Sequence, residues 1–221
     1  MELYIFDLDG TIIDSSKDIA KAVNYAFEKL RLNKFPEEEI VKYVGYGARK
    51  LIEDLIPDKQ DYWEESLNLF REYYNQNPSV HTKPYPYVKE VLEYLKENNK
   101  NIAVLTNKYE KISKDILKDI GLWEYIDLVV GADTLDTRKP EPDGVYFILK
   151  VLEKNKEESI LIGDSEVDVL TGKNAGIKTA LLLHGYGNKE LAKNLNPDYI
   201  FKDFKDLLSE VKKWNGKQLS L

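Results

Sequence analysis

The chain has 221 residues, of which 43% are hydrophobic and 32% are charged, and its formal net charge is −7. This length suits one sizeable domain or a core domain with a smaller insertion, and the acidic balance argues against general nucleic-acid binding. The absence of cysteine excludes disulfides, thiolate catalysis and cysteine-held zinc, and a histidine-rich metal site is not expected from only two histidines. No apolar run approaches the ~20 residues that cross a bilayer. We therefore expect a cytoplasmic protein without a membrane partner.

Short apolar runs along the chain predict the buried strands of a parallel sheet, at residues 3–6, 101–105, 126–130, 159–163 and 179–183. The runs are apolar throughout and rich in β-branched residues, as in strands that are covered on both faces. Helical stripes at 88–97, 110–120 and 143–153 alternate with them. This alternation predicts an α/β fold with a doubly wound, mostly parallel sheet, which is a Rossmann-like core.

The long segment between the first and second predicted strands looks helical instead. An apolar stripe with a 3.6-residue period follows Ser15 and Ser16, either of which could cap the helix. Pro36 suits the first turn of a second helix that would extend to Val44. The helical pattern resumes at Ala48, after two glycines. These helices predict an inserted α-helical cap.

The predicted division of the chain follows from this insertion. We expect an α/β core over residues 1–14 and 83–215 and a helical cap over 15–82. Residues 216–221 have the composition of a disordered tail.

Chemically reactive side chains follow the predicted strands. Asp7 and Asp9 end the first strand, and further candidates follow the later strands: Thr106, Asn107, Lys139, Asp164 and Asp168. Ligands of an open α/β sheet bind at the carboxyl ends of its strands. We therefore expect these side chains to converge on one cleft.

Four carboxylates in one cleft need compensation, because like charges at close range repel each other. A divalent cation and a lysine would supply it. Oxygen ligands without histidine or cysteine point to Mg²⁺ or another hard cation. Such a cation, together with a lysine, a hydroxyl and backbone N–H groups, makes a phosphoryl clamp. The sequence therefore predicts chemistry on a small phosphorylated substrate.

The motifs "DLDGT", "LTN", "KP" and "GDSEVD" resemble, in order and spacing, those of the haloacid dehalogenase superfamily, in its phosphatase branch. The resemblance covers the chain from Leu3 to about Leu183. Within this branch, "YVGYGARKLI", "TKPYP" and "HGYG" are similar to segments of the phosphoglycolate phosphatases. The chain departs from that group at Tyr87, where a hinge glycine is expected.

The resemblance implies a role for each core residue. Asp7 would be the nucleophile that forms an aspartyl-phosphate, and Asp9 would be the general acid and then the general base. Residues two apart in a strand face the same side, so both carboxylates can reach one substrate. Thr106 and the backbone at Asn107 would hold the phosphoryl oxygens, and Lys139 would neutralise them.

The same resemblance implies a Mg²⁺ site. Its ligands would be the carboxylates of Asp7 and Asp164 and the backbone carbonyl of Asp9. Asp168 would act on the ion through water or through hydrogen bonds to the ligands.

Specificity is expected to come from the cap. Gly45 and Gly47 suggest a tight turn with exposed backbone N–H groups at a new helix N-terminus. Arg49 lies in the first turn of that helix, where its guanidinium could bind a substrate carboxylate in a bidentate manner. Alternatively, the glycines only bend the helix and Arg49 is solvated.

The leading hypothesis is thus a Mg²⁺-dependent phosphomonoester hydrolase, with 2-phosphoglycolate as the first-choice substrate. A dehalogenase is disfavoured because it would need neither a metal nor a second, proton-shuttling acid. A pyrophosphatase and a sugar phosphomutase of the same superfamily stay open. A non-catalytic binding module is the alternative from another class, although it would have no need for so many repelling carboxylates. Both a monomer and a homodimer are compatible with the sequence.

Overall fold

The computed structural model describes residues 1–216 and contains a six-stranded parallel sheet. The strand order is β5-β4-β1-β6-β7-β8, and every neighbouring pair is parallel. The strands are β1 (Leu3–Phe6), β4 (Asn101–Leu105), β5 (Leu128–Val130), β6 (Ser159–Gly163), β7 (Lys178–Leu182) and β8 (Tyr199–Phe201). This sheet confirms the predicted doubly wound α/β class.

Within this six-stranded sheet, two strand boundaries and one strand differ from the prediction. The strand expected at 126–130 starts only at Leu128, because the 3-10 helix η3 (Trp123–Tyr125) occupies the chain just before it. The strand expected at 179–183 is shifted by one residue, to Lys178–Leu182. The edge strand β8 was not predicted, since three residues are too few to show a period.

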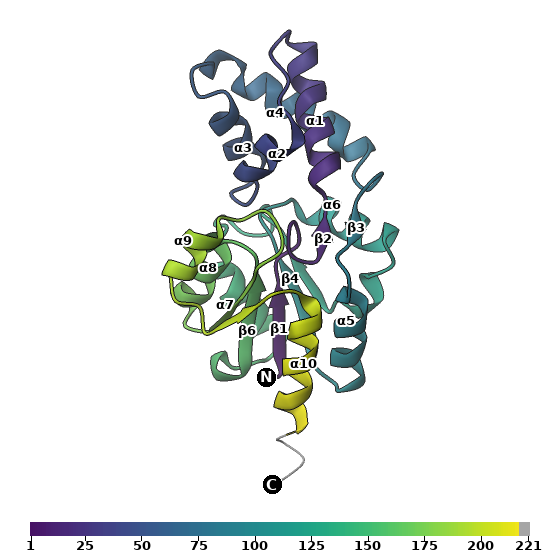
Figure 1. The fold of residues 1–221 in the computed structure, drawn as a ribbon, viewed down its shortest axis with the longest axis vertical. Helices are drawn as coiled ribbons and strands as arrows, with labels where there is room; N and C mark the ends of the chain where they lie inside the picture. The colour runs from purple at the N-terminus through teal and green to yellow at the C-terminus, as the bar shows by residue number, and fades with distance from the viewer. Residues whose placement is uncertain (217–221) are drawn as a thin grey trace.

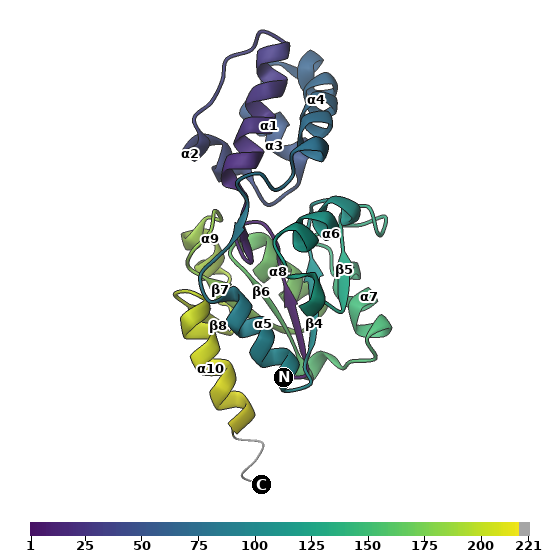
Figure 2. The ribbon, with the colours of Figure 1, turned by 90° about the vertical axis from the view of Figure 1, so that its right-hand side faces the viewer.

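Helices cover both faces of the sheet. Side chains alternate along β1, so that Tyr4 and Phe6 face one apolar cluster whereas Leu3 and Ile5 face the other. The first face is covered by α5 (Val88–Glu97), α6 (Glu110–Asp119) and α10 (Phe204–Gly216). The second is covered by α7 (Asp143–Val151) and α8 (Glu166–Ala175), with α9 (Lys189–Asn194) beside α8. Figure 2 shows α5 and α10 lying in front of the sheet.

A second group of helices lies beyond the carboxyl ends of the strands (Figure 1). It consists of α1 (Ser16–Lys29), α2 (Glu37–Ile40), α3 (Ala48–Leu55) and α4 (Trp63–Gln76), with the 3-10 helices η1 (Val41–Tyr43) and η2 (Gln60–Tyr62). Two chain segments join it to the sheet, and they pair as the short antiparallel strands β2 (Ile13–Asp14) and β3 (Lys83–Pro84). We propose that this group is the cap, as the predicted division at 15–82 has it.

Two local predictions are corrected by the structure, and the predicted N-cap at Ser15 is confirmed in position only. The second cap helix ends at Ile40, and the chain continues as η1 into extended backbone at Val44, so the helix does not reach that residue. Ser15 is the N-cap residue of α1, but its side chain forms no capping bond and instead contacts Asp9. Gly216 is the last residue of α10, so it does not belong to the predicted tail, and the rest of that tail, 217–221, lies outside the described residues.

None of the helices within residues 1–216 combines the length and the apolar character that a bilayer crossing requires.

Candidate active site

The candidate site lies at the carboxyl edge of the sheet, next to its central strand. The chain runs from β1 through β4 to β5 on one side and returns to β6 on the other, so the strand order switches at β1. Such a switch point leaves a crevice outside the strand ends. Asp7, Thr106 and Asp164 directly follow β1, β4 and β6, and all three are buried.

Lys139 lies among the buried carboxylates. Its Nζ is 2.7 Å from Asp7 Oδ1 and 2.6 Å from Asp168 Oδ1. The other oxygen of Asp168 accepts hydrogen bonds from the backbone N–H and the hydroxyl of Ser165, in a capping box that begins α8. Burial lowers the pKa of Lys139, but the charges of Asp168 and Asp7 outweigh burial and hold this pKa above its ordinary value. The lysine is therefore a fixed positive charge beside Asp7.

Three carboxylates form the one cluster among the described residues that could hold a metal ion. Asp7, Asp164 and Asp168 each place an oxygen within 4.8 Å of the others. Burial raises the pKa of Asp7 to about 8 against the opposing charge of Lys139, and burial also raises the pKa of Asp164. The positive charges beside the cluster, Lys139 and Lys189, therefore do not fully offset burial and the mutual repulsion of the carboxylates. An all-oxygen donor set of this kind fits a hard divalent cation, which would favour the ionised carboxylates.

The turn after β1 approaches Asp164 closely. Gly10 has a φ of 80°, and a Cβ at this position would lie 2.8 Å from Asp164 Oδ2. Thr11 donates a hydrogen bond from Oγ1 to Asp164 Oδ1 at 2.9 Å. Glycine is therefore required both by the left-handed backbone and by the space beside the carboxylate.

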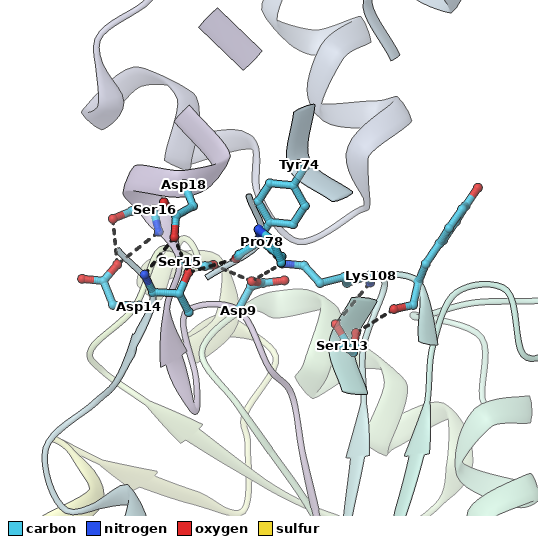
Figure 3. A network of polar contacts seen from close by, with 12 residues as sticks. Asp9, Asp14, Ser15, Ser16, Asp18, Tyr74, Pro78, Lys108 and Ser113 are labelled. Atoms are coloured by element: carbon cyan, nitrogen blue, oxygen red, sulfur yellow. Dashed lines mark hydrogen bonds and ion pairs between the residues drawn. The ribbon is translucent and has the colours of Figure 1, made fainter. Parts of the chain in front are cut away.

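Asp9 is not one of the three clustered carboxylates, and it contacts both Ser15, at the start of the cap, and Lys108, in the core (Figure 3). Its Oδ1 accepts hydrogen bonds from the hydroxyl of Ser15 and from Lys108 Nζ, the latter at 2.7 Å. The same Nζ donates to the hydroxyl of Tyr74, in the cap helix α4, at 2.8 Å. Burial lowers the pKa of Lys108, but Asp9 and Tyr74 raise it by more, so the ammonium stays charged.

Lys108 and Tyr74 were not predicted as site residues, and Ser15 was predicted only as a helix cap. Lys108 directly follows the "LTN" motif, but no local pattern shows that its side chain turns toward Asp9. Tyr74 belongs to an aromatic run that reads as cap core, and its ring does stack on Phe70 with centroids 5.4 Å apart. Only the packing of α4 over the core reveals the role of its hydroxyl.

The loop with the "HGYG" motif, which was noted but given no role, contacts the site from β7. The backbone N–H groups of Tyr186 and Gly187 donate to Asp164 Oδ2 at 2.7 and 2.9 Å. The hydroxyl of Tyr186 accepts hydrogen bonds from the backbone N–H groups of Ser15 and Ser16, at the start of α1. Tyr186 therefore connects the acid cluster to the first residues of the cap.

A cavity of about 460 Å³ lies between the core and the cap helices. Both groups of residues predicted to act on the substrate contribute to its wall: Asp7, Asp9, Thr106 and Asn107 from the core, and Gly45, Gly47 and Arg49 from the cap. Within the described chain, Lys139 and Asp164 are not part of this wall, although Lys139 contacts Asp7.

The glycine turn of the cap is held against the core. The side-chain amide of Asn107 donates hydrogen bonds to the backbone oxygen of Gly45 at 2.9 Å and of Lys139 at 3.0 Å. Gly47 has a φ of 91° and is the N-cap residue of α3, as the predicted turn requires. Arg49 follows in α3, and its guanidinium is 2.6 Å from Glu64 and 3.8 Å from Glu53. Its role toward a substrate stays a prediction.

A buried acid cluster with a fixed lysine, open to a cavity at the switch point of a doubly wound sheet, is the arrangement of an α/β-class enzyme. The comparison with protein families agrees with this class and narrows it. Residues 4–182 match the model of the haloacid dehalogenase-like hydrolases, and the chain belongs to this family.

Similar proteins include enzymes with two different names. The chain is 44% identical over 186 residues to a phosphoglycolate phosphatase of Aquifex aeolicus, which covers 84% of this chain and 86% of the relative. It is 36% identical over 208 residues to a provisionally named pyrophosphatase of Caldanaerobacter subterraneus, over 94% of this chain and 93% of that one. The crystal structure of a predicted phosphoglycolate phosphatase from Haemophilus somnus superposes with a TM-score of 0.88 at 29% identity, over 96% and 98% of the two chains.

Proposed function

We propose that this protein is a Mg²⁺-dependent phosphomonoester hydrolase that acts on a small phosphorylated metabolite through an aspartyl-phosphate on Asp7. The observation that carries the proposal is the position of Asp7. Its carboxylate ends the central strand, lies 2.7 Å from the Lys139 ammonium and opens to the cavity that Asp9 also lines. Membership of a hydrolase family supports the same reading.

In the first step, a carboxylate oxygen of Asp7 attacks phosphorus and the bond from phosphorus to the ester oxygen breaks. Asp9 donates a proton to the leaving oxygen, which departs as an alcohol. Thr106 and the backbone at Asn107 hold the phosphoryl oxygens, and Lys139 balances their charge. The products of this step are the alcohol and the phosphorylated Asp7.

In the second step, water attacks the same phosphorus atom and Asp9, now a carboxylate, accepts a proton from it. The bond from phosphorus to the Asp7 oxygen breaks. Inorganic phosphate leaves, and the Asp7 carboxylate and the protonated Asp9 are restored for the next turnover.

The cation would be held by the carboxylates of Asp7 and Asp164 and by the backbone carbonyl of Asp9, with Asp168 acting through water or hydrogen bonds. When bound, Mg²⁺ would supply positive charge to the phosphoryl oxygens. Support comes from the all-oxygen donor set and from the raised pKa of Asp7 and of Asp164.

The first-choice substrate is 2-phosphoglycolate, because the relative from Aquifex aeolicus carries the name phosphoglycolate phosphatase. Pyrophosphate is the second candidate, because the relative from Caldanaerobacter subterraneus is provisionally named a pyrophosphatase. Arg49 and the turn at Gly45 and Gly47 remain candidates for contacts to the part of the substrate that is not transferred.

The test is a phosphate-release assay with Mg²⁺ over a panel that includes 2-phosphoglycolate, glucose phosphates and pyrophosphate. We expect chelation to remove activity and Mg²⁺ to restore it. Ca²⁺ should bind but support little turnover, because its larger and looser coordination would misplace Asp7 relative to phosphorus. Full activity in excess chelator would contradict the metal-dependent mechanism.

A further inference from the structure

The cavity wall carries four positively charged side chains from different parts of the chain: Arg49, Arg71, Lys108 and Arg138. Their partners distinguish them. Arg49 pairs with Glu64 and Glu53, and Lys108 pairs with Asp9. Arg71 donates a hydrogen bond to the hydroxyl of Tyr109 and lies over its ring, 5.0 Å from the centroid.

Arg138 differs from the other three. Within residues 1–216, its guanidinium forms no hydrogen bond, ion pair or aromatic contact. A neighbouring cavity also carries Glu53 and Glu141 beside Arg138, but neither lies within 4.0 Å of the guanidinium. An arginine is always charged and presents a planar fork of donors. Among the four, Arg138 is therefore the one whose guanidinium donors are all without a partner within residues 1–216, so they can bind an anion.

The position of Arg138 places that free charge close to the reacting groups. It directly precedes Lys139, whose ammonium contacts Asp7, and adjacent Cα atoms are about 3.8 Å apart. Arg138 and Lys139 thus belong to one loop: Lys139 contacts the nucleophile, and Arg138 lines the cavity into which the nucleophile opens.

The glycine turn of the cap lies next to the guanidinium. A Cβ added at Gly47 would lie 3.7 Å from Arg138 Nη1, in van der Waals contact, and 3.2 Å from the backbone oxygen of Asn107, which is tight. Glycine therefore keeps side-chain atoms away from Arg138 and also permits the positive φ of the turn.

We propose that Arg138 is a specificity-determining residue that binds a second anionic group of the substrate, such as a carboxylate, while the phosphoryl group lies at Asp7. The inference rests on the proposed function and narrows its substrate class to short phosphate compounds with two anionic ends. It assigns to Arg138 the recognition that the sequence alone suggested for Arg49.

The experiment compares two substrates of the same length, 2-phosphoglycolate and ethyl phosphate, which differ by a carboxylate in place of a methyl group. The readout is the ratio of their kcat/KM values at saturating Mg²⁺. We expect Arg138→Ala to lower this ratio by about ten- to a hundredfold, the value of a charge-assisted hydrogen bond. Arg138→Lys should lower it less, because a point charge remains without the bidentate fork.

Arg49→Ala tests the competing candidate, because it also removes an arginine from the same wall. If Arg138 binds the second anionic group, Arg49→Ala should lower the ratio less than Arg138→Ala does, since Arg49 is already paired with Glu64 and Glu53. An unchanged ratio in Arg138→Ala, or a selective loss in Arg49→Ala alone, overturns the inference. Arg138 is exposed, so its variants should fold, and circular dichroism checks this.

The wild-type enzyme separates the failure of this inference from that of the proposed function. If it hydrolyses both esters equally well, the inference fails and the phosphatase assignment stands. If it releases phosphate from no ester in the presence of Mg²⁺, the proposed function fails and the inference fails with it.

Discussion

The charged side chains named above are more deeply buried at the core edge than in the cap. At the core edge, Lys139 is 2% exposed and bonds to two buried carboxylates, and Lys108 is 10% exposed and bonds to Asp9. In the cap, Arg49 is 41% exposed, and its partners Glu53 and Glu64 belong to the cap as well. The groups assigned to the chemistry are therefore fixed before a substrate arrives, whereas the cap can move without breaking its own ion pairs.

Direct polar bonds join the two regions at several points along the cavity and the connecting segments. The Tyr74 hydroxyl accepts from Lys108, the Gly45 carbonyl accepts from Asn107, and the Ser15 hydroxyl donates to Asp9. The comparison teaches that substrate specificity and cap closure can be altered at these contacts without loss of the catalytic groups. Substitutions in each region test this division between the core edge and the cap.

The largest effect is expected at the nucleophile. Asp7→Asn keeps the shape of the side chain but loses the attacking anion, so kcat should fall by more than about 10⁴, as when other enzymes lose a nucleophile. The fold should persist, because one charge leaves an under-compensated acid cluster. Steady-state kinetics and a thermal melt check the two parts. A variant that keeps a tenth of the activity would exclude the covalent mechanism.

A smaller loss is expected at Asp9, and it should depend on the substrate. Asp9→Asn cannot transfer the proton, which typically costs about 10²–10⁴ in rate. The loss should be smaller for nitrophenyl phosphate than for an alkyl phosphate, because a good leaving group needs little protonation. The difference between the two esters is expected only where the first step limits the rate. Equal losses for the two esters would speak against the general-acid role.

The sequence allowed the core side of this comparison to be predicted well. Asp7, Thr106 and Asp164 come directly after strands whose apolar runs are plain, and parallel strands bring their carboxyl ends together. The partners of these residues were harder to see. Lys108 and Tyr186 reach the site through side-chain directions that depend on loop conformation, and no residue period encodes these directions.

The cap side was predicted only in outline. Its helices and glycine turn were expected, but the charge of Arg49 was not expected to be bound within the cap. That pairing depends on how α3 packs beside the start of α4, where Glu64 lies. Contacts between helices that are separated by a loop cannot be predicted from one helical stripe, so neither the pairing of Arg49 nor the absence of a partner for Arg138 within residues 1–216 could be predicted from the sequence.

The next effect concerns stability at the core edge. Lys139→Met leaves Asp7 and Asp168 buried without their ammonium partner, and breaking a buried pair in this way costs about 3–5 kcal/mol. We expect urea denaturation to show a loss of unfolding free energy of this order. Added Mg²⁺ should recover part of it, because a cation bound to the folded state stabilises that state by mass action.

The matched control for this prediction is an exposed pair. Lys34 lies 2.8 Å from Glu28, and their side chains are 55% and 66% exposed. Lys34→Met should change the unfolding free energy by less than about 1 kcal/mol, as is usual for surface pairs. If Lys139→Met and Lys34→Met lose equal free energy of unfolding, Lys139 does not stabilise the fold in the way that its buried contacts indicate.

The smallest effects are expected from a tyrosine-to-phenylalanine substitution, made once in the cap and once in the core. Tyr74→Phe removes the hydroxyl that accepts from the Lys108 ammonium, and a hydrogen bond to a charged group contributes about 1.5–3 kcal/mol. Because Lys108 keeps Asp9 as a partner, the loss of unfolding free energy should fall at or below the lower end of that range.

Tyr4→Phe should have the opposite effect on stability, since the Tyr4 hydroxyl is buried and has no hydrogen-bond partner within residues 1–216. Removing it should leave the unfolding free energy unchanged or raise it by about 1 kcal/mol. Urea denaturation of both variants against the wild type measures the two signs. A loss in Tyr4→Phe equal to that in Tyr74→Phe would show that the contact between Tyr74 and Lys108 does not hold the cap to the core.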